Sequence, residues 1–302
     1  MNDQRVSDGW DLSAFPRDLR GFWQMSLAVL GRRVNYGLNV FDREWDVLIV
    51  LDACRYDLFE EFAPEHPVYD RFDSVEPVYS CASATPEWIP KTFNQDHDDL
   101  VSRTHYVSGT GYSTKIEPGR VHAVDEVWGY AVDPESKVTR PEAVTNAAIR
   151  AYRESDAERF IFHYLPPHAP FLHCPGKYDS IGDGAGGTQT VWNGLQDGRF
   201  DADEVWEDYG RNLGPGLDEV ETVLDNVSGK VVVTADHGNA LGEWGIYGHP
   251  NYVPVPAIKR VPWAEATGAG RDEYEVKDDD EVATGLGEQD LDEHLRALGY
   301  KR

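Results

Sequence analysis

Carboxylate and imidazole side chains follow two apolar runs of the sequence. Asp52 ends the run at 45–52, and Asp236 with His237 closes the run at 230–236. Continuous apolar runs of this length predict buried parallel strands, and ligands of open α/β sheets bind outside the carboxyl ends of such strands. A lone Asp there commonly caps the next helix. Two such strands together predict a site for a divalent ion, with an imidazole that suits zinc or manganese.

A hydroxyl nucleophile is predicted in the segment SCASATPEW (80–88). Pro86 at the first position of a helix would place Thr85 at the N-cap, beside the positive helix end where anions are also held. Bound to a metal ion, that hydroxyl would lose its proton more readily and become an attacking oxygen. An ordinary Thr cap is the alternative interpretation, and Ser83 is a second candidate nucleophile.

Two further histidines lie on loops where they could face a ligand. His168 is flanked by prolines in HYLPPHAPFLH, which favours an extended loop, although a surface histidine is the alternative. His249 lies on a glycine-bordered loop twelve residues after His237. His163 falls inside a strand pattern and is assigned to the core.

Strand patterns alternate with helical ones, which predicts an α/β doubly wound, mostly parallel sheet with helices on both faces. The clearest helix is PEAVTNAAIRAYRES (141–155), opened by a proline, and another is expected from 203 to 227, interrupted near GPG. A Gly-rich loop is expected at 181–187 and a helix in RYDLFEEFA. The expected strands are 45–52, 105–110, 121–128, 159–165 and 230–236.

The composition is strongly acidic. The 302 residues include 54 Asp and Glu against 28 Lys and Arg, a net charge of −26, which excludes a general affinity for nucleic acid because that needs a basic face. Aromatic residues make up 12% and the charge is spread along the chain, so global disorder is also excluded. High salt screens such self-repulsion, since the Debye length falls to about 3 Å at 1 M. We therefore expect a halophilic protein.

Reduced thiols and a cytoplasmic location are expected. Cys54, Cys81 and Cys174 form no CxxC pair. The first residues, MNDQRVSDGWDLSAFPRDL, lack the cationic start and apolar run of a signal peptide, and no stretch approaches the ~20 apolar residues of a membrane span.

Four motifs together resemble sulfatase-like proteins of the alkaline phosphatase superfamily. WDVLIVLDACRYDLF resembles their opening strand with its metal-binding Asp, and VVVTADHGNALGEWGIYGH resembles their C-terminal signature. LPPHAPF is similar to their Pro-His-x-Pro loop, and LRALGY to the end of many of them. The resemblance implies an alkaline-phosphatase-like fold that acts on phosphate or sulfate esters, with one divalent ion (Mn, Zn, Mg or Ca). The metal ligands that it implies are Asp52, Thr85, Asp236 and His237.

The resemblance also implies roles for other residues. His168 would bind anionic oxygens of the substrate, and His249 would assist the leaving group or an additional ion. Typical sulfatases carry Cys (or Ser)-x-Pro-x-Arg, whereas the segment that begins at Cys81 lacks both Pro and Arg, so Cys81 is expected to be a buried thiol. A threonine nucleophile resembles the phosphodiesterase and lipoteichoic-acid-synthase-like branches, which favours phosphorus over sulfur. Two-zinc relatives place an Asp and a His four residues apart, but His168 and His173 stand five apart, so a second ion is not expected.

Three parts of the chain follow. Residues 1–40 are expected to form a helical extension packed on the domain, with peripheral contact to a membrane surface as the alternative for GFWQMSLAVLGRRVNYGL. Residues 41–262 would form the sulfatase-like domain, and residues 263–302 an acidic linker with a short docking helix.

The expected function is a metal-dependent hydrolase or transferase of small-molecule or glycan phosphate or sulfate esters, with a covalent Thr85 intermediate. A catalytically inactive relative that binds an anionic glycan or a sugar phosphate is the alternative. Retention of the metal residues argues against it. The sequence leaves the oligomeric state open.

Removal of salt tests the halophilic interpretation. Because self-repulsion of the −26 charge is unscreened at low ionic strength, dialysis from molar salt to low salt is expected to unfold the chain. Far-UV circular dichroism before and after dialysis measures this, and an unchanged melting temperature would contradict the interpretation.

Overall fold

One mixed sheet organises the structure, a computed structural model that describes residues 17–34, 36–133, 136, 138–178 and 191–278. Its strand order is β2-β9-β6-β1-β5-β3-β4, with parallel pairing from β6 through β4 and antiparallel pairing of β9 and β2 at one side. A two-stranded ribbon, β7 with β8, lies apart from it. The strands are β1 (Val47–Leu51), β2 (Phe72–Tyr79), β3 (Thr104–Ser108), β4 (Ala123–Glu126), β5 (Arg159–Tyr164), β6 (Ser228–Thr234), β7 (Ala240–Leu241), β8 (Tyr247–Gly248) and β9 (Arg260–Ala269).

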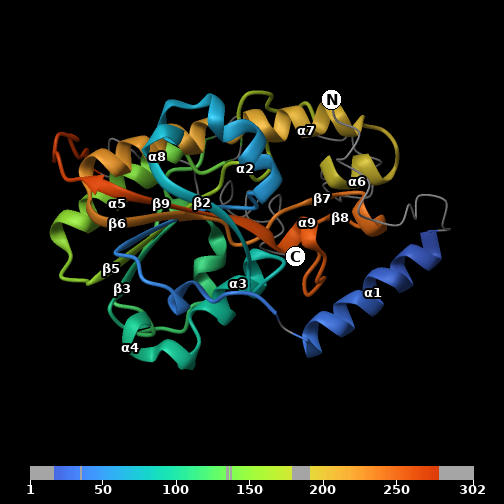
Figure 1. The fold of residues 1–302 in the computed structure, drawn as a ribbon, viewed down its shortest axis with the longest axis horizontal. Coiled ribbons are helices and arrows are strands. Elements are labelled where there is room, and N and C mark those ends of the chain that lie inside the picture. Colours follow the sequence, from blue (N-terminus) through green and yellow to red (C-terminus); the bar gives the residue numbers. More distant parts are fainter. Residues whose placement is uncertain (1–16, 35, 134–135, 137, 179–190, 279–302) are drawn as a thin grey trace.

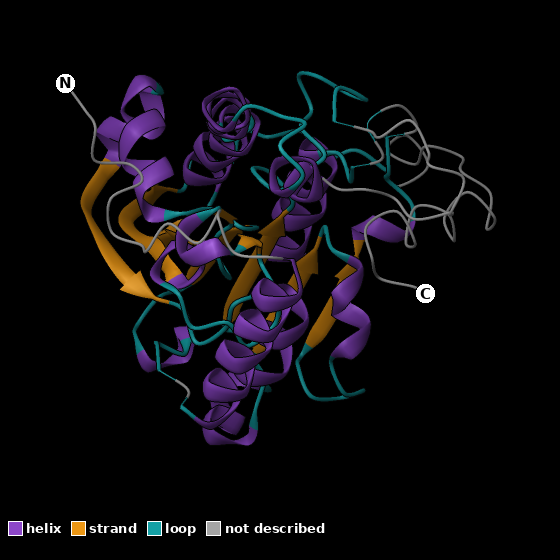
Figure 2. Cartoon of the chain, turned by 90° about the vertical axis from the view of Figure 1, so that its right-hand side faces the viewer, coloured by secondary structure: helices purple, strands orange, loops and turns teal. Residues whose placement is uncertain are grey.

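Helices cover both faces of this sheet, as Figures 1 and 2 show. In Figure 1, α2, α5, α7 and α8 lie above the sheet, and α3 and α4 lie below it. The helices are α1 (Arg17–Arg33), α2 (Tyr56–Phe62), α3 (Thr85–Thr92), α4 (Asp98–Val101), α5 (Pro141–Glu154), α6 (Val191–Gln196), α7 (Ala202–Arg211), α8 (Gly214–Asn226) and α9 (Pro256–Lys259). The doubly wound, mostly parallel α/β architecture predicted from the sequence is confirmed.

The apolar composition of the central strands follows from this double cover. All five residues of β1 are buried, and β5 and β6 flank it in parallel register. A strand covered on both faces has no solvent side, so it reads as a continuous apolar run rather than an alternating one. For this reason the predicted strands that correspond to β1, β3, β5 and β6 were recognisable. The strand predicted at 121–128 corresponds to β4, a partly exposed strand at the edge of the sheet.

The interruption predicted near GPG within the helix at 203–227 is confirmed. The helix expected from 203 to 227 consists of two helices, α7 and α8, because Pro215 begins a new helix near the GPG sequence. Asp201 caps α7 by accepting hydrogen bonds from the backbone N–H groups of Asp203 and Glu204 at 3.0 and 3.1 Å. α7 thereby keeps a fixed start, and its later residues reach the candidate site.

The predicted domain boundary at residue 262 is wrong. β9 extends to Ala269 and lies between β6 and β2, with Trp263, Ala264 and Ala266 buried. The strand therefore belongs to the core of the domain, not to a linker. The docking helix expected near the C-terminus and the Gly-rich loop at 181–187 lie outside the described residues.

The N-terminal helical extension exists as α1 and packs on the domain. Leu27 joins an apolar cluster with Val253, Val255 and Ile258, and the indole Nε1 of Trp23 donates to the Trp244 carbonyl at 3.0 Å. No helix among the described residues is both long and apolar enough to cross a membrane.

A charge placed in β9 distinguishes a core strand from a linker. Ala264→Asp is expected to lower the free energy of unfolding by about 3–5 kcal/mol, because it buries a carboxylate without a partner. Thr267→Asp adds the same charge at an exposed position of the same strand and should change it by less than about 0.5 kcal/mol. Denaturant unfolding measures both, and equal stabilities would restore the linker interpretation.

Candidate active site

The turn after β1 is the first element of the site. Asp52 continues from the strand, with its N–H donating to the Tyr164 carbonyl at 2.9 Å. Ala53 then adopts a left-handed backbone with φ of 62°, a strained conformation for a residue with a side chain. Its N–H donates to Oδ1 of Asp236 at 3.0 Å, and the Tyr209 hydroxyl donates to its carbonyl. The strained turn therefore joins the ends of β1 and β6.

Asp236 and His237 follow β6 with their functional atoms directed inward. Oδ1 of Asp236 also accepts the His237 N–H at 2.9 Å, so its other oxygen, Oδ2, faces Nε2 of His237 at 3.3 Å. Nδ1 of His237 donates to the Gly238 carbonyl at 3.0 Å. This hydrogen bond fixes the neutral tautomer in which Nε2 carries the lone pair that a metal ion requires.

Thr85 begins α3 rather than capping it. Ala84, with extended φ and ψ of −164° and 152°, is the N-cap, so the predicted cap position of Thr85 is wrong by one residue. The Thr85 hydroxyl thus takes no part in capping and faces the strand ends. Its oxygen lies 3.3 Å from Oδ2 of Asp52 and 3.2 Å from Nε2 of His237.

These four side chains converge on one buried centre. Each is at most 2% exposed. Within the described part of the chain, Oδ1 of Asp52 and Oδ2 of Asp236 have no hydrogen-bond partner. Buried carboxylate oxygens without donors are costly unless a cation lies beside them, and two carboxylates with an imidazole are a common donor set for a divalent ion. The residues present therefore fit a divalent metal ion.

The imidazoles around Asp52 keep it charged. Burial alone would raise the pKa of this carboxyl, but the adjacent imidazole of His163 and the nearby imidazoles of His168 and His237 hold the pKa well below its usual range. The site therefore retains an anionic ligand across the physiological pH range.

His163 is a site neighbour that the sequence interpretation assigned only to the core. It is fully buried in β5, where it pairs in register with Val50 of β1. Its Nδ1 accepts from the Tyr106 hydroxyl at 2.7 Å, and its Nε2 lies 3.5 Å from Oδ2 of Asp52. An imidazole inside an otherwise apolar parallel strand was the available signal, because such a polar group needs a buried partner.

His168 and His249 form a pair beside this centre. Nδ1 of His168 donates to the Ala169 carbonyl, so Nε2 of His249 donates to Nε2 of His168 at 3.1 Å. The His249 ring stacks on His237, with centroids 4.4 Å apart. Burial, with the imidazoles of His237 and His168 nearby, holds the pKa of His249 well below its ordinary value. Both predicted loop histidines therefore lie next to the metal-ligand candidates.

The second candidate nucleophile, Ser83, has structural partners instead. Its hydroxyl donates toward Oε2 of Glu87 at 2.8 Å and the Pro250 carbonyl at 3.0 Å, and it accepts the Val253 N–H at 3.2 Å. This use of its donor and acceptor sites ties α3 to the loop that carries His249. Thr85 is the hydroxyl that faces the carboxylates.

Cys81 is a buried free thiol, as predicted. It is 3% exposed, and burial raises its pKa to about 11. At neutral pH it is therefore a protonated thiol. Cys54 and Cys174 are also free.

Arg55 links the two strand-end segments. Although burial opposes its charge, the carboxylates of Glu243 and Asp57 raise the pKa of this guanidinium. It donates to the Asn239 carbonyl at 2.9 Å and to Glu243 at 2.6 Å. A side chain on Gly238 would place its Cβ 2.7 Å from Cγ of Arg55 and from the Ala257 carbonyl. Glycine is required there by this close approach and not by its backbone conformation, which has no positive φ.

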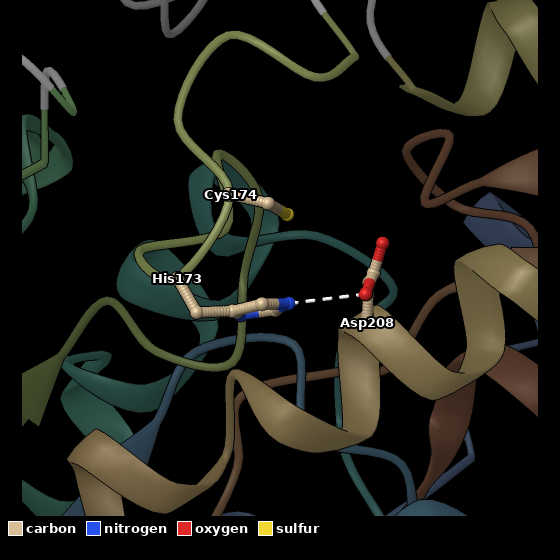
Figure 3. Close-up of side chains that lie close together, drawn as sticks. All are labelled: His173, Cys174 and Asp208. Atoms are coloured by element: carbon tan, nitrogen blue, oxygen red, sulfur yellow. Dashed lines mark hydrogen bonds and ion pairs between the residues drawn. The ribbon is translucent and has the colours of Figure 1, made fainter.

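A second cluster of side chains that could bind a metal ion lies away from this centre. Figure 3 shows His173 directed at Asp208 of α7, with Cys174 beside them. Nε2 of His173 lies 3.1 Å from Oδ1 of Asp208, but Oδ2 already accepts from Lys177 and, at 2.6 Å, from Tyr178. With its charge compensated by Lys177, this carboxylate serves as an anchor for the loop.

Asn212, the C-cap of α7 and one turn after Asp208, holds the loop that carries His168. Nδ2 of this buried Asn212 donates to the carbonyls of Pro167 and His168 at 3.1 Å, and its Oδ1 accepts the Leu172 N–H at 2.8 Å. The backbone of the loop is therefore fixed where His168 meets His249.

Comparison with solved structures finds this architecture in other enzymes. The soluble domain of lipooligosaccharide phosphoethanolamine transferase A from Neisseria meningitidis is 14% identical, with a TM-score of 0.50 over 83% of this chain and 86% of that one. The integral membrane form of that transferase is also 14% identical, with a TM-score of 0.52 over 90% of this chain and 59% of that one. A protein of the alkaline phosphatase superfamily from Vibrio parahaemolyticus is 14% identical, with a TM-score of 0.42, over 83% and 69% of the two chains.

Neither a protein-family model nor a curated protein sequence matches this chain. At identities this low, a structural match establishes the fold alone. The α/β fold predicted from the sequence motifs is confirmed: the chain has the fold of the phosphoethanolamine transferase structures.

Proposed function

We propose that this protein is a metal-dependent enzyme that transfers or hydrolyses a phosphate ester through Thr85. One observation carries the proposal: the Thr85 hydroxyl lies within 3.3 Å of both Asp52 and His237, in a buried centre with unpartnered carboxylate oxygens. A hydroxyl needs such surroundings to become nucleophilic. The fold shared with phosphoethanolamine transferases supports the same class of reaction.

The ion would be held by the two strand-end carboxylates, the imidazole and the hydroxyl. When bound, a divalent ion supplies positive charge that lowers the pKa of a hydroxyl ligand and stabilises anionic oxygens of the transferred group. The residues concerned are Asp52, Thr85, Asp236 and His237.

The chain's own residues define the two displacement steps. Thr85 Oγ1 attacks phosphorus, the bond from phosphorus to the leaving oxygen breaks, and the leaving alcohol takes up one proton in place of the one that the hydroxyl loses. Oδ2 of Asp52, 3.3 Å from that hydroxyl, accepts its hydrogen bond and orients the oxygen. Because the pKa of Asp52 lies well below its usual range, the threonine proton passes to water and not to this carboxylate. Water or a second alcohol then displaces Thr85 from phosphorus and restores the hydroxyl.

His168 and His249 would act on the substrate side of the centre. Nε2 of His249 carries a proton that it shares with Nε2 of His168 across 3.1 Å. Because the pKa of His249 is held low, its imidazole is neutral. This N–H can therefore donate a hydrogen bond to an anionic oxygen of the transferred group or to the leaving oxygen, and the leaving alcohol takes its proton from water. Asn212 fixes the loop of this pair, so its geometry does not depend on the bound substrate.

Phosphorus is preferred to sulfur because the formylglycine route is not supported. That route needs a sulfatase motif, whereas Cys81 is a buried thiol 3.9 Å from the Thr92 hydroxyl and lies outside the group formed by Thr85 and Asp52. We propose small-molecule or glycan phosphate esters as substrates, in a halophilic, cytoplasmic setting.

Removing the Thr85 hydroxyl tests its role. Thr85→Ala is expected to lower turnover of an aryl phosphodiester by at least about 10³-fold, because the group that attacks phosphorus is lost, while bound metal is retained. Ser83→Ala is the matched control, two residues away, and should keep most of the turnover because Ser83 contacts Glu87 and not the centre.

The assay uses phosphomonoester, phosphodiester and sulfate ester substrates in molar salt, with Mn²⁺, Zn²⁺, Mg²⁺ and Ca²⁺ supplied separately. Full turnover by Thr85→Ala would contradict a covalent threonine intermediate. Metal binding without turnover of any ester would favour the inactive, ligand-binding relative.

Metal content distinguishes the two clusters of ligand types. We expect one ion per wild-type chain by mass spectrometry, less than a tenth of that for Asp236→Asn, and one ion for Asp208→Asn. The ion should also stabilise the wild type, by about 2.7 kcal/mol at a concentration 100-fold above its Kd. If Asp208→Asn loses the ion and Asp236→Asn keeps it, the site has been placed at the wrong cluster.

A further inference from the structure

The apolar surface of this protein is concentrated on one helix. Seven large apolar side chains are exposed in the described part of the chain, and six of them lie between residues 19 and 34; the seventh is Tyr79. The six, with their exposed fractions, are Leu19 (50%), Phe22 (67%), Met25 (59%), Val29 (49%), Leu30 (51%) and Val34 (55%). Monomeric soluble proteins seldom gather so many large apolar groups in one place.

These residues form a stripe because they recur at helical spacing. Leu19, Phe22, Met25 and Val29 follow one another at intervals of three or four residues, which places them on one side of α1. The opposite side is occupied by the domain. Leu27 is buried there, and a Cβ on Gly31 would meet the Tyr252 carbonyl at 1.9 Å. The exposed stripe is therefore not the packing face of the helix.

The charge of this segment is opposite to that of the rest of the chain. Residues 19–34 contain three Arg and no Asp or Glu, in a protein of 54 acidic and 28 basic residues. Arg32 and Arg33 are exposed in the last turn, next to the stripe. Apolar side chains flanked by arginine are complementary to a surface that is apolar inside and anionic outside.

We propose that α1 binds an anionic lipid surface, with the stripe from Leu19 to Val34 inserted among the acyl chains and Arg32 and Arg33 at the headgroups. Its 17 residues span about 25 Å, too short to cross a bilayer, so the helix lies in the plane of the interface. A second copy is the less favourable occupant, because it would bring together two stripes that both carry arginines, with no anionic partner for either. The proposal does not depend on the proposed catalytic function.

The helix α1 lies close to the candidate site. Figure 1 places α1 at the end of the molecule that carries β7, β8 and α9. The Arg32 guanidinium lies 4.7 Å from the ring centre of Tyr252, whose N–H donates to Glu87 of α3 at 2.9 Å. Tyr252 is three residues after His249, so the side of α1 that faces away from the stripe packs against the loop that bears this histidine.

Vesicle flotation with the full chain tests the proposal. Vesicles of phosphatidylcholine and phosphatidylglycerol (7:3) are used in salt at which circular dichroism shows the chain folded. We expect the wild type to float with the vesicles and Phe22→Asp to have a partition coefficient at least tenfold lower. Gln24→Asp adds the same charge to an exposed position of α1 outside the stripe, and it should partition within twofold of the wild type.

Three results would overturn the proposal. The wild type does not float, or Phe22→Asp floats as well as the wild type. Alternatively, light scattering after size exclusion shows a wild-type dimer that Phe22→Asp converts to monomers, with no flotation of either, which would identify a second copy as the partner. Melting temperatures of the variants within a few degrees of the wild type establish that a loss of flotation is not a loss of fold.

Discussion

Two buried carboxylates at one end of the sheet impose the constraint on which the rest of the site depends. Asp52 and Asp236 are 2% and 0% exposed, and burying each charge costs several kcal/mol unless it is compensated. The N–H groups of Ala53 and His237 compensate one oxygen of Asp236, and imidazoles surround Asp52. Among the described residues, Oδ1 of Asp52 and Oδ2 of Asp236 have no hydrogen-bond donor, and both lie near Nε2 of His237. A cation there would turn two costly groups into ligands, so the residues at this end of the sheet are compatible with a divalent ion.

The contacts that compensate these buried charges also fix the positions of the two strand ends relative to each other. The Ala53 turn adopts its strained backbone because its N–H reaches Asp236, so the position of β1 is set by the residue that follows β6. Arg55 repeats the link by joining the turn after β1 to Asn239 and Glu243. With a side chain on Gly238 this approach would be closed. The distance between Asp52 and His237 therefore follows from backbone contacts, and no bound ligand is needed to set it.

The strands that are buried on both faces of the sheet could be predicted from the sequence. β1, β5 and β6 have helices on both sides, so their continuous apolar runs identify them as strands. Their carboxyl ends meet at one edge of the sheet. β2 and β9 could not be recognised, because Pro77 and Pro262 argue against a strand. In the structure these two prolines lie opposite each other, so both missing donors fall at one place in the ladder. His163 was recognised as buried, but contact with Asp52 depends on the register between β5 and β1, which one sequence does not contain.

The choice between the two hydroxyls shows how local geometry resolves what spacing leaves open. Ser83 and Thr85 are two residues apart, and both precede or begin a helix. Ala84 between them is extended, and the helix starts only at Thr85, so Ser83 stands one full turn before Glu87 and within 2.8 Å of its carboxylate. Ser83 is thereby bound to the α3 surface that meets the His249 loop, and Thr85, at the first helical position, is turned toward β1 and β6. The start of the helix between them therefore separates the two hydroxyls: Ser83 contacts Glu87, and Thr85 faces Asp52 and His237.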